Sequence, residues 1–111
     1  MKWLMLSIAL VSSTPAFALT GNDFLKLSES SQTSLVVAYR DGFMLGAVMN
    51  GDLGSKFQKL QDCTRPWPGT QSLAVVQLYM KANPAEWGLP MDILWFRAVN
   101  PACGNPYLHI P

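Results

Sequence analysis

The amino-acid sequence predicts a compact, small all-α domain of four to five short helices stapled by one disulfide. From residue 19 onward, no segment alternates apolar and polar residues at period two, and no two-residue Asn-Gly or Asp-Gly turn joins two β-rich runs. Apolar residues instead recur at spacings of three and four, in segments bounded by glycine, proline or asparagine. Short helices with short connections pack into a single helical domain.

The first two expected helices are separated by a run rich in serine. Thr20 caps a short helix whose N-terminus is favoured by the charge of Asp23, and the run 28–31 ends it. The second helix, residues 32–49, is the longest, and Asn50-Gly51 is its stop signal. Its apolar stripe comprises Leu35, Val36, Tyr39, Phe43, Gly46 and Ala47.

Two glycines, Gly42 and Gly46, lie inside this second helix. A glycine in a helix interior costs up to about 1 kcal/mol relative to alanine. We therefore expect another backbone to approach the helix closely at these two positions.

A proline-rich loop follows the second helix and a shorter helical segment. Residues 52–61 have room for one or two helical turns before Cys63. Residues 64–69 form an irregular loop, because Pro66 and Pro68 flank Trp67 and each proline disfavours helix in the residue before it. This loop is stiff and begins directly after a cysteine.

Two further helices complete the expected domain. Thr70 caps a helix over 71–82, and Asn83 caps a short turn in which Pro84 takes the first position. The last helix runs from about 91 to 99, with Leu94, Trp95 and Ala98 on its buried side, and Pro101 stops it. We expect residues 104–111 to form a tail.

The first eighteen residues have the order of a secretory signal peptide. Lys2 gives a basic start, Trp3–Val11 is almost entirely apolar, and Ala16-Phe17-Ala18 forms a small-residue cleavage site. The alternative is an uncleaved membrane anchor, but the apolar run is well short of the roughly 20 residues that a spanning helix needs. Cleavage after Ala18 leaves one domain, residues 19–111, outside the cytoplasm.

The charge of the exported part is balanced. The chain has seven acidic and eight basic residues, and one of the basic residues, Lys2, lies in the leader. The sequence therefore predicts no nucleic-acid partner, which would call for a basic patch, and no attachment to a membrane surface after cleavage.

Two cysteines, Cys63 and Cys103, lie in the exported part. An oxidising compartment and an even number of cysteines favour a disulfide between them. Two buried free thiols, or a bond between two chains, are the alternatives.

No catalytic or metal-binding set is recognisable in the sequence. His109 is the only histidine, and its place near the end of the chain is typical of a solvated side chain. Phosphate-binding loops, zinc-protease motifs and nucleophile elbows are missing, although any two of the seven carboxylates could still meet in space. We expect a protein that is not an enzyme and that binds no cofactor or metal.

The proline loop is the candidate binding element. Trp67 stands between prolines, and Arg65 precedes it by two residues. Trp and Arg are the residue types most enriched at binding hot spots, and a rigid loop loses little entropy on binding. The alternative for Trp67 is that it folds back over the core as a lid.

Several of these segments together resemble the Rap/Tai family of exported immunity proteins of type VI secretion. The resemblance rests on Tyr39-x-x-Gly42-x-x-x-Gly46-Ala47, on Pro68-Gly69-Thr70 with the helix 71–80, on Asn83-Pro84-Ala85-Glu86-Trp87, and on the ending in proline and cysteine. It extends from about Leu19 to Cys103. Members are small, all-helical periplasmic proteins that protect a bacterium from peptidoglycan amidase effectors delivered by sister cells.

The resemblance implies a function and an assembly. The protein would bind a cell-wall amidase effector and occlude its active site, Cys63 and Cys103 would be the paired cysteines, and the face at Tyr39, Gly42 and Gly46 would pack against a second copy in a homodimer. The alternative function is that of a general periplasmic structural or stress-related helical protein that has no toxin partner.

Overall fold

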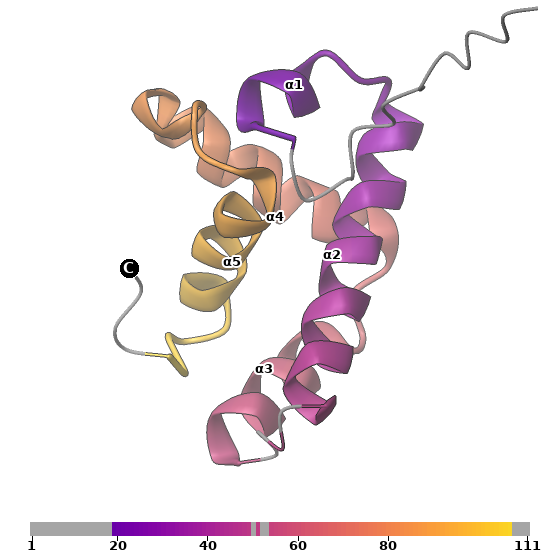
Figure 1. The fold of residues 1–111 in the computed structure, drawn as a ribbon, viewed down its shortest axis with the longest axis vertical. Helices are drawn as coiled ribbons and strands as arrows, with labels where there is room; N and C mark the ends of the chain where they lie inside the picture. The colour runs from indigo at the N-terminus through magenta and orange to yellow at the C-terminus, as the bar shows by residue number, and fades with distance from the viewer. Residues whose placement is uncertain (1–18, 50, 52–53, 108–111) are drawn as a thin grey trace, which may run out of the picture.

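Five α-helices and one 3₁₀ turn make up the described part of the chain (Figure 1). The computed structural model describes residues 19–49, 51 and 54–107. The elements are α1 (Gly21–Leu25), α2 (Glu29–Met49), α3 (Ser55–Thr64), α4 (Gly69–Ala82), η2 (Pro84–Glu86) and α5 (Met91–Ala102). The predicted all-α fold is confirmed, whereas the expected signal peptide, residues 1–18, lies outside the described residues.

Helix α4 holds the domain together by packing against both α2 and α5. Figure 1 shows α2 and α5 in front of α4, with α1 above them and α3 beside the lower end of α2. One apolar core fills the space between these helices. Its buried members are Phe24, Val36, Leu60, Leu73, Val76, Met80, Met91, Leu94, Trp95, Ala98 and Val99.

The N-terminal caps explain how α1 and α2 begin. Thr20 caps α1 as predicted, and Asp23, expected to act only through its charge, completes a reciprocal capping box with it. Helix α2 begins at Glu29 and not at residue 32, because the hydroxyl of Ser28 accepts a hydrogen bond from the amide of Ser31 at 3.2 Å. The serine run therefore caps the second helix as well as following the first.

The buried side chain of Gln32 connects α2 to two other helices. Its Nε2 donates to the carbonyls of Phe24 at 3.0 Å and Leu27 at 3.2 Å, while its Oε1 accepts from Gln77 on α4 at 3.0 Å. The bond to Leu27 supplies a donor for its carbonyl, and the bond to Phe24 adds a second donor to a carbonyl that already accepts from the amide of Leu27 at 3.1 Å.

Helix α3 is longer than its expected one or two turns, and it carries Cys63 within its last turn. Helix α4 begins at Gly69, so the predicted Thr70 cap is wrong. The capping position is Pro68, whose extended backbone places its carbonyl to accept from Gln71 and Ser72, each at 3.0 Å.

Asn83 occupies the N-cap position of η2 and Pro84 its first position, as expected, but no side-chain capping bond forms. The Nδ2 of Asn83 instead donates to the carbonyl of Tyr79 at 2.8 Å. Glu86 accepts hydrogen bonds from Tyr79 on α4 at 2.7 Å and from Arg97 on α5 at 3.1 Å. It therefore ties η2 to two helices.

Helix α5 continues through Pro101, so the prediction that this proline stops it is wrong. Its end is set by Gly104, which has a φ of 83°. The amide of Gly104 donates to Pro101 and that of Asn105 to Asn100, which is the Schellman pattern at a helix C-terminus. Pro101 has no backbone N–H, so the last turn of α5 lacks one hydrogen-bond donor, and the helix nevertheless continues to Ala102.

The expected tail after residue 103 folds back onto the domain as far as Tyr107. The fully buried side chain of Asn100 accepts from the amide of Tyr107 at 3.0 Å and donates to its carbonyl at 2.7 Å. His109 lies outside the described residues.

Candidate functional site

A disulfide joins Cys63 in the last turn of α3 to Cys103 at the end of α5. The sulfur atoms are 2.07 Å apart and the Cα atoms 5.7 Å apart, within the usual geometry of such bonds. The intramolecular pairing is therefore confirmed, and neither cysteine is free. The bond anchors the chain in α3, two residues before the proline loop begins at Arg65.

The loop itself, Arg65–Pro68, is held at both ends by backbone contacts. The amide of Trp67 donates to Thr64 at 3.0 Å, and Pro68 starts α4. Gly69 lets α2 lie close to this junction, since a Cβ on Gly69 would lie 2.9 Å from the Cγ2 of Thr33 on α2. The chain thus passes from α3 to α4 in a fixed conformation.

Arg65 is the charged residue of this loop, and its side chain is accessible. Its side chain is 64% exposed and lies 3.7 Å from the carboxylate of Asp62, which is also exposed. An exposed pair of this kind contributes little to stability, typically less than about 1 kcal/mol. Arg65 can therefore leave Asp62 for a partner at small cost.

Trp67 takes a position between its two predicted alternatives. The indole is half-buried and packs against the hydrophobic core, while the flanking Pro66 and Pro68 are exposed. The loop therefore offers a partner Arg65, two prolines and the accessible part of an indole that packs against the core.

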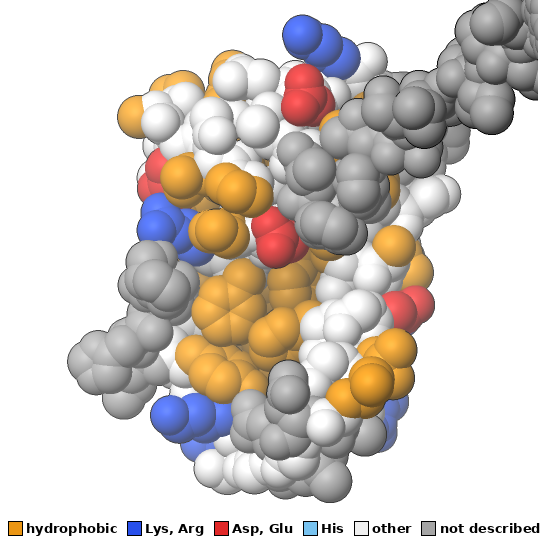
Figure 2. Space-filling model, viewed as in Figure 1, with side chains coloured by type: hydrophobic (Ala, Val, Ile, Leu, Met, Phe, Trp, Pro, Cys, Tyr) orange, Lys and Arg blue, Asp and Glu red, His pale blue; other side chains and the backbone are white. Residues whose placement is uncertain are grey.

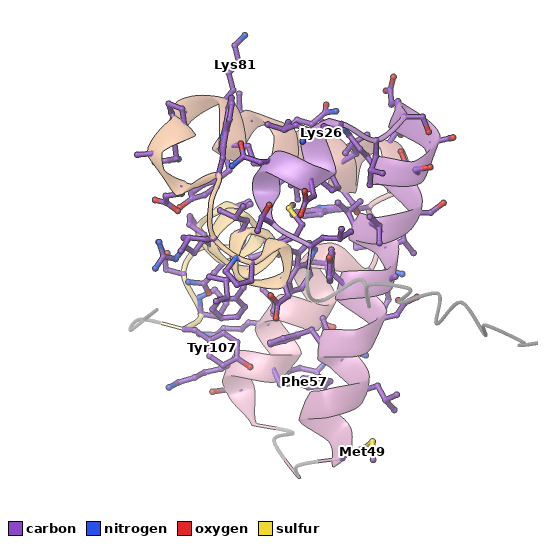
Figure 3. The ribbon with its side chains drawn as sticks, turned by 45° about the horizontal axis from the view of Figure 1, so that its top comes forward. Lys26, Met49, Phe57, Lys81 and Tyr107 are labelled. Carbon is purple, nitrogen blue, oxygen red and sulfur yellow. A yellow bond between two sulfur atoms is a disulfide. The ribbon has the colours of Figure 1, made fainter. Side chains whose placement is uncertain are left out.

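The two glycines of α2 do not mark close packing within the described part of the chain. A Cβ placed on Gly42 or Gly46 would meet no atom within 4 Å, so no other helix of the same chain makes the expected close approach at these positions. Helix α2 carries an exposed apolar stripe at this position. The stripe consists of Ala38, Gly42, Leu45 and Met49, the last of which is labelled at the foot of α2 in Figure 3.

The glycines that do permit close approach are Gly21 and Gly69. A Cβ on Gly21 would lie 2.6 Å from the Cδ1 of Leu94 and 2.9 Å from the carbonyl oxygen of Trp87. Neither close approach could be predicted from local sequence, because the residues concerned come from distant segments.

Aromatic side chains gather on the concave side of the molecule between α2 and α5 (Figure 2). The ring of Phe43 lies 5.6 Å from Trp95, 5.5 Å from Phe96 and 6.1 Å from Tyr107, and Phe96 lies 5.4 Å from Tyr107. We call this surface, with Tyr39, the aromatic face. Tyr39 belongs to it because it lies one turn before Phe43 on the same side of α2, and both side chains are half-buried against the core.

Opposite charges lie at the two ends of the aromatic face. The ammonium of Lys56 on α3 lies 6.0 Å above the ring of Tyr107, which Figure 3 labels. At the other end, burial raises the pKa of Tyr39 to about 12, and the negative charge of Asp92 adds to this shift. Sequence reasoning missed Asp92, Lys56 and Tyr107, since no local pattern brings α3, α5 and the C-terminal segment together.

The described residues show no ready-made metal centre. Within residues 19–49, 51 and 54–107, no group of three or more His, Cys, Asp or Glu side chains could hold a metal ion.

In the same part of the chain, no helix combines the length and apolarity that crossing a membrane requires.

Comparisons with protein-family models, with curated proteins and with solved structures found no match.

Proposed function

We propose that this protein is an exported binding protein that inhibits a peptidoglycan amidase effector of type VI secretion by occluding its active site in the periplasm. The observation that carries the proposal is the braced proline loop, which presents Arg65 and Trp67 beside the Cys63–Cys103 bond. An inhibitor of this kind needs a preorganised protruding element, because any order that it must acquire on binding reduces affinity.

Three observations support this proposal. The leader-like first eighteen residues and the disulfide both fit an oxidising compartment outside the cytoplasm. The all-α fold agrees with the helical character of the Rap/Tai proteins that the sequence resembles. We infer that the protein acts by binding and has no catalytic activity of its own.

The proposed assembly is a homodimer formed through α2. The exposed stripe of Ala38, Gly42, Leu45 and Met49 has small residues that would let a second helix come close, and its Leu45 and Met49 side chains are 61% and 77% exposed. Exposed apolar residues that are contiguous on one helix face are typical of protein interfaces.

Inhibition of amidase activity tests the function directly. The oxidised protein is added to purified type VI amidase effectors acting on isolated peptidoglycan, and release of soluble fragments is measured. We expect one effector to be inhibited at near-stoichiometric concentration. If none is inhibited or bound, the proposal fails and the role of a general periplasmic helical protein is favoured.

Charge reversal at the loop tests the proposed contact. We expect Arg65→Glu to weaken inhibition at least tenfold, because it places an acidic group where a partner would receive a cation. Lys81→Glu is the matched control, since Lys81 is exposed near the far end of α4, roughly 18 Å along the helix from the loop. Equal inhibition by wild type and Arg65→Glu would show that this loop is not the contact.

A further inference from the structure

Helices α2 and α5 run in the same direction across the concave side of the molecule. Tyr39 and Phe43 lie one turn apart on α2, and Asp92 and Phe96 lie one turn apart on α5. Phe43 contacts Phe96, while Asp92 acts electrostatically on Tyr39. The two helices therefore form the aromatic face, with a carboxylate at one end of it.

The rings of the aromatic face are held in place by the core on which they pack and by the segment that follows α5. Trp95, which is only 2% exposed, supports Phe43 from the core. Tyr107 is held in place through its backbone by the buried side chain of Asn100, and the disulfide fixes the end of α5. A partner would meet rings that are already positioned, so few side chains need to be ordered on binding.

The two ends of the aromatic face carry opposite exposed charges, and neither charge forms an ion pair within the described residues. Lys56 already provides a cation above Tyr107. Asp92 is exposed, and no Lys or Arg of the described residues forms an ion pair with it. Figure 2 shows an apolar patch on this side of the molecule, with an acidic side chain above it and basic side chains below it.

A cation from outside the molecule fits the end at Asp92. A guanidinium or ammonium group there would pair with the carboxylate and rest against the neighbouring ring of Tyr39, and both contacts favour a positive charge. Arginine satisfies both, since its planar head stacks on aromatic rings and its stem covers apolar surface.

We propose that the aromatic face docks a segment of a partner protein that inserts an arginine or lysine between Asp92 and Tyr39 and lays apolar side chains over Phe43 and Phe96. The proposed ligand is therefore a peptide segment that combines a basic residue with apolar residues. This surface is separate from the Arg65–Pro68 loop. The proposal does not depend on amidase inhibition, and inhibition can fail while peptide docking at this face succeeds.

Selection of peptides with the oxidised full-length protein tests the docking site. A random dodecapeptide library is panned against wild type and against Asp92→Lys. We expect wild type to enrich peptides that combine aromatic or branched aliphatic residues with Arg or Lys, and Asp92→Lys to enrich Asp or Glu in place of the basic residue. The best wild-type peptide should lose on the order of tenfold in affinity for Asp92→Asn.

Glu29→Gln is the matched control for Asp92→Asn. Glu29 is also an exposed acidic residue in the first turn of a helix, so both changes remove the same favourable charge from a helix N-terminus. Both variants should lose similar thermal stability, and only Asp92→Asn should lose peptide affinity.

Three outcomes would overturn the proposal. The first is enrichment of the same peptides by wild type and Asp92→Lys. The second is amide chemical-shift changes, on adding the selected peptide, that lie outside α2, α5 and Tyr107. The third is dissociation of a dimer by the selected peptide in light scattering, which would make a second copy of this chain the occupant.

Discussion

Gly21 and Gly42 show how differently the same residue type can act in one small domain. Gly21 lies where α1 meets Leu94 and the backbone of Trp87, and an added Cβ would overlap both. Gly42 lies in the interior of α2, where an added Cβ would meet nothing within 4 Å. Only the first glycine is required by the fold of the single chain.

This contrast leads to a paired prediction on stability. Gly21→Ala should lower the free energy of unfolding by about 1–3 kcal/mol, because the carbonyl oxygen of Trp87 cannot move away as a flexible side chain could. Gly42→Ala should raise it by up to about 1 kcal/mol, because alanine loses less backbone entropy in a helix. Urea unfolding followed by circular dichroism measures both, and destabilisation of similar size by both would contradict the model of two distinct roles.

At the scale of elements, a short turn between α4 and α5 is held in place by one carboxylate. The 3₁₀ turn η2 has no buried residue of its own. Glu86 on this turn accepts from the hydroxyl of Tyr79 and from the guanidinium of Arg97, so it links η2 to α4 and α5. Both hydrogen bonds lower the pKa of Glu86, with the contribution of Tyr79 the larger.

The lowered pKa of Glu86 predicts how stability depends on pH. The unfolded chain takes up this proton near the ordinary value of 4.5, before the folded chain does. The contribution of Glu86 is therefore complete above about pH 6 and is lost as the pH falls through 4.5 toward the lower pKa of the folded protein.

Unfolding experiments on Glu86→Gln measure this contribution. Wild type should be more stable than Glu86→Gln at pH 7, and the difference should shrink as the pH falls to 3. Asp62→Asn serves as the control, because Asp62 is exposed and pairs only with neighbours on its own helix and loop. A stability difference between wild type and Glu86→Gln that stays constant from pH 7 to pH 3 would rule out this role.

For the whole molecule, the disulfide is the main long-range constraint. It joins residues that are 40 positions apart and holds α3 against the end of α5, two helices that otherwise share few contacts. By the chain-entropy relation, closing a loop of this length stabilises the folded state by about 4 kcal/mol. A domain of this size has a small core, so this is a large part of its stability.

Reduction of the disulfide should therefore lower the melting temperature by roughly 15–30 °C. Differential scanning calorimetry with and without a phosphine reductant measures the change, and the double variant Cys63→Ser with Cys103→Ser checks that the reductant acts through this bond. Melting curves that coincide in the two conditions would show that the bond contributes nothing to stability.

Helix type and approximate extent follow from local sequence, and the structure agrees with them in most places. The periodicity of α2 and the buried side of α5 at Leu94, Trp95 and Ala98 are local properties of 3.6-residue repeats. Helix ends were less predictable. Ser28, Pro68 and Gly104 determine three helix ends that the sequence did not assign to them. Several residues near each end could make the required backbone bonds, so local sequence does not single out one of them.

Only part of the candidate site could be predicted from the sequence. The cysteine pair and the stiff loop at Arg65 and Trp67 were predictable, because compartment, parity and proline chemistry are local or compositional. The aromatic face was not, since Phe43, Asp92 and Tyr107 meet only after α2, α5 and the C-terminal segment pack around α4.

The sequence by itself determined that this protein is a small all-α domain with one disulfide, because helical periodicity, proline and glycine punctuation and two cysteines are properties of the chain alone. Tertiary structure decided which glycines are needed for packing, how Glu86 is used and where charges border the aromatic face. These features depend on distances between distant segments, and such distances are set only when the apolar faces of the helices are buried together.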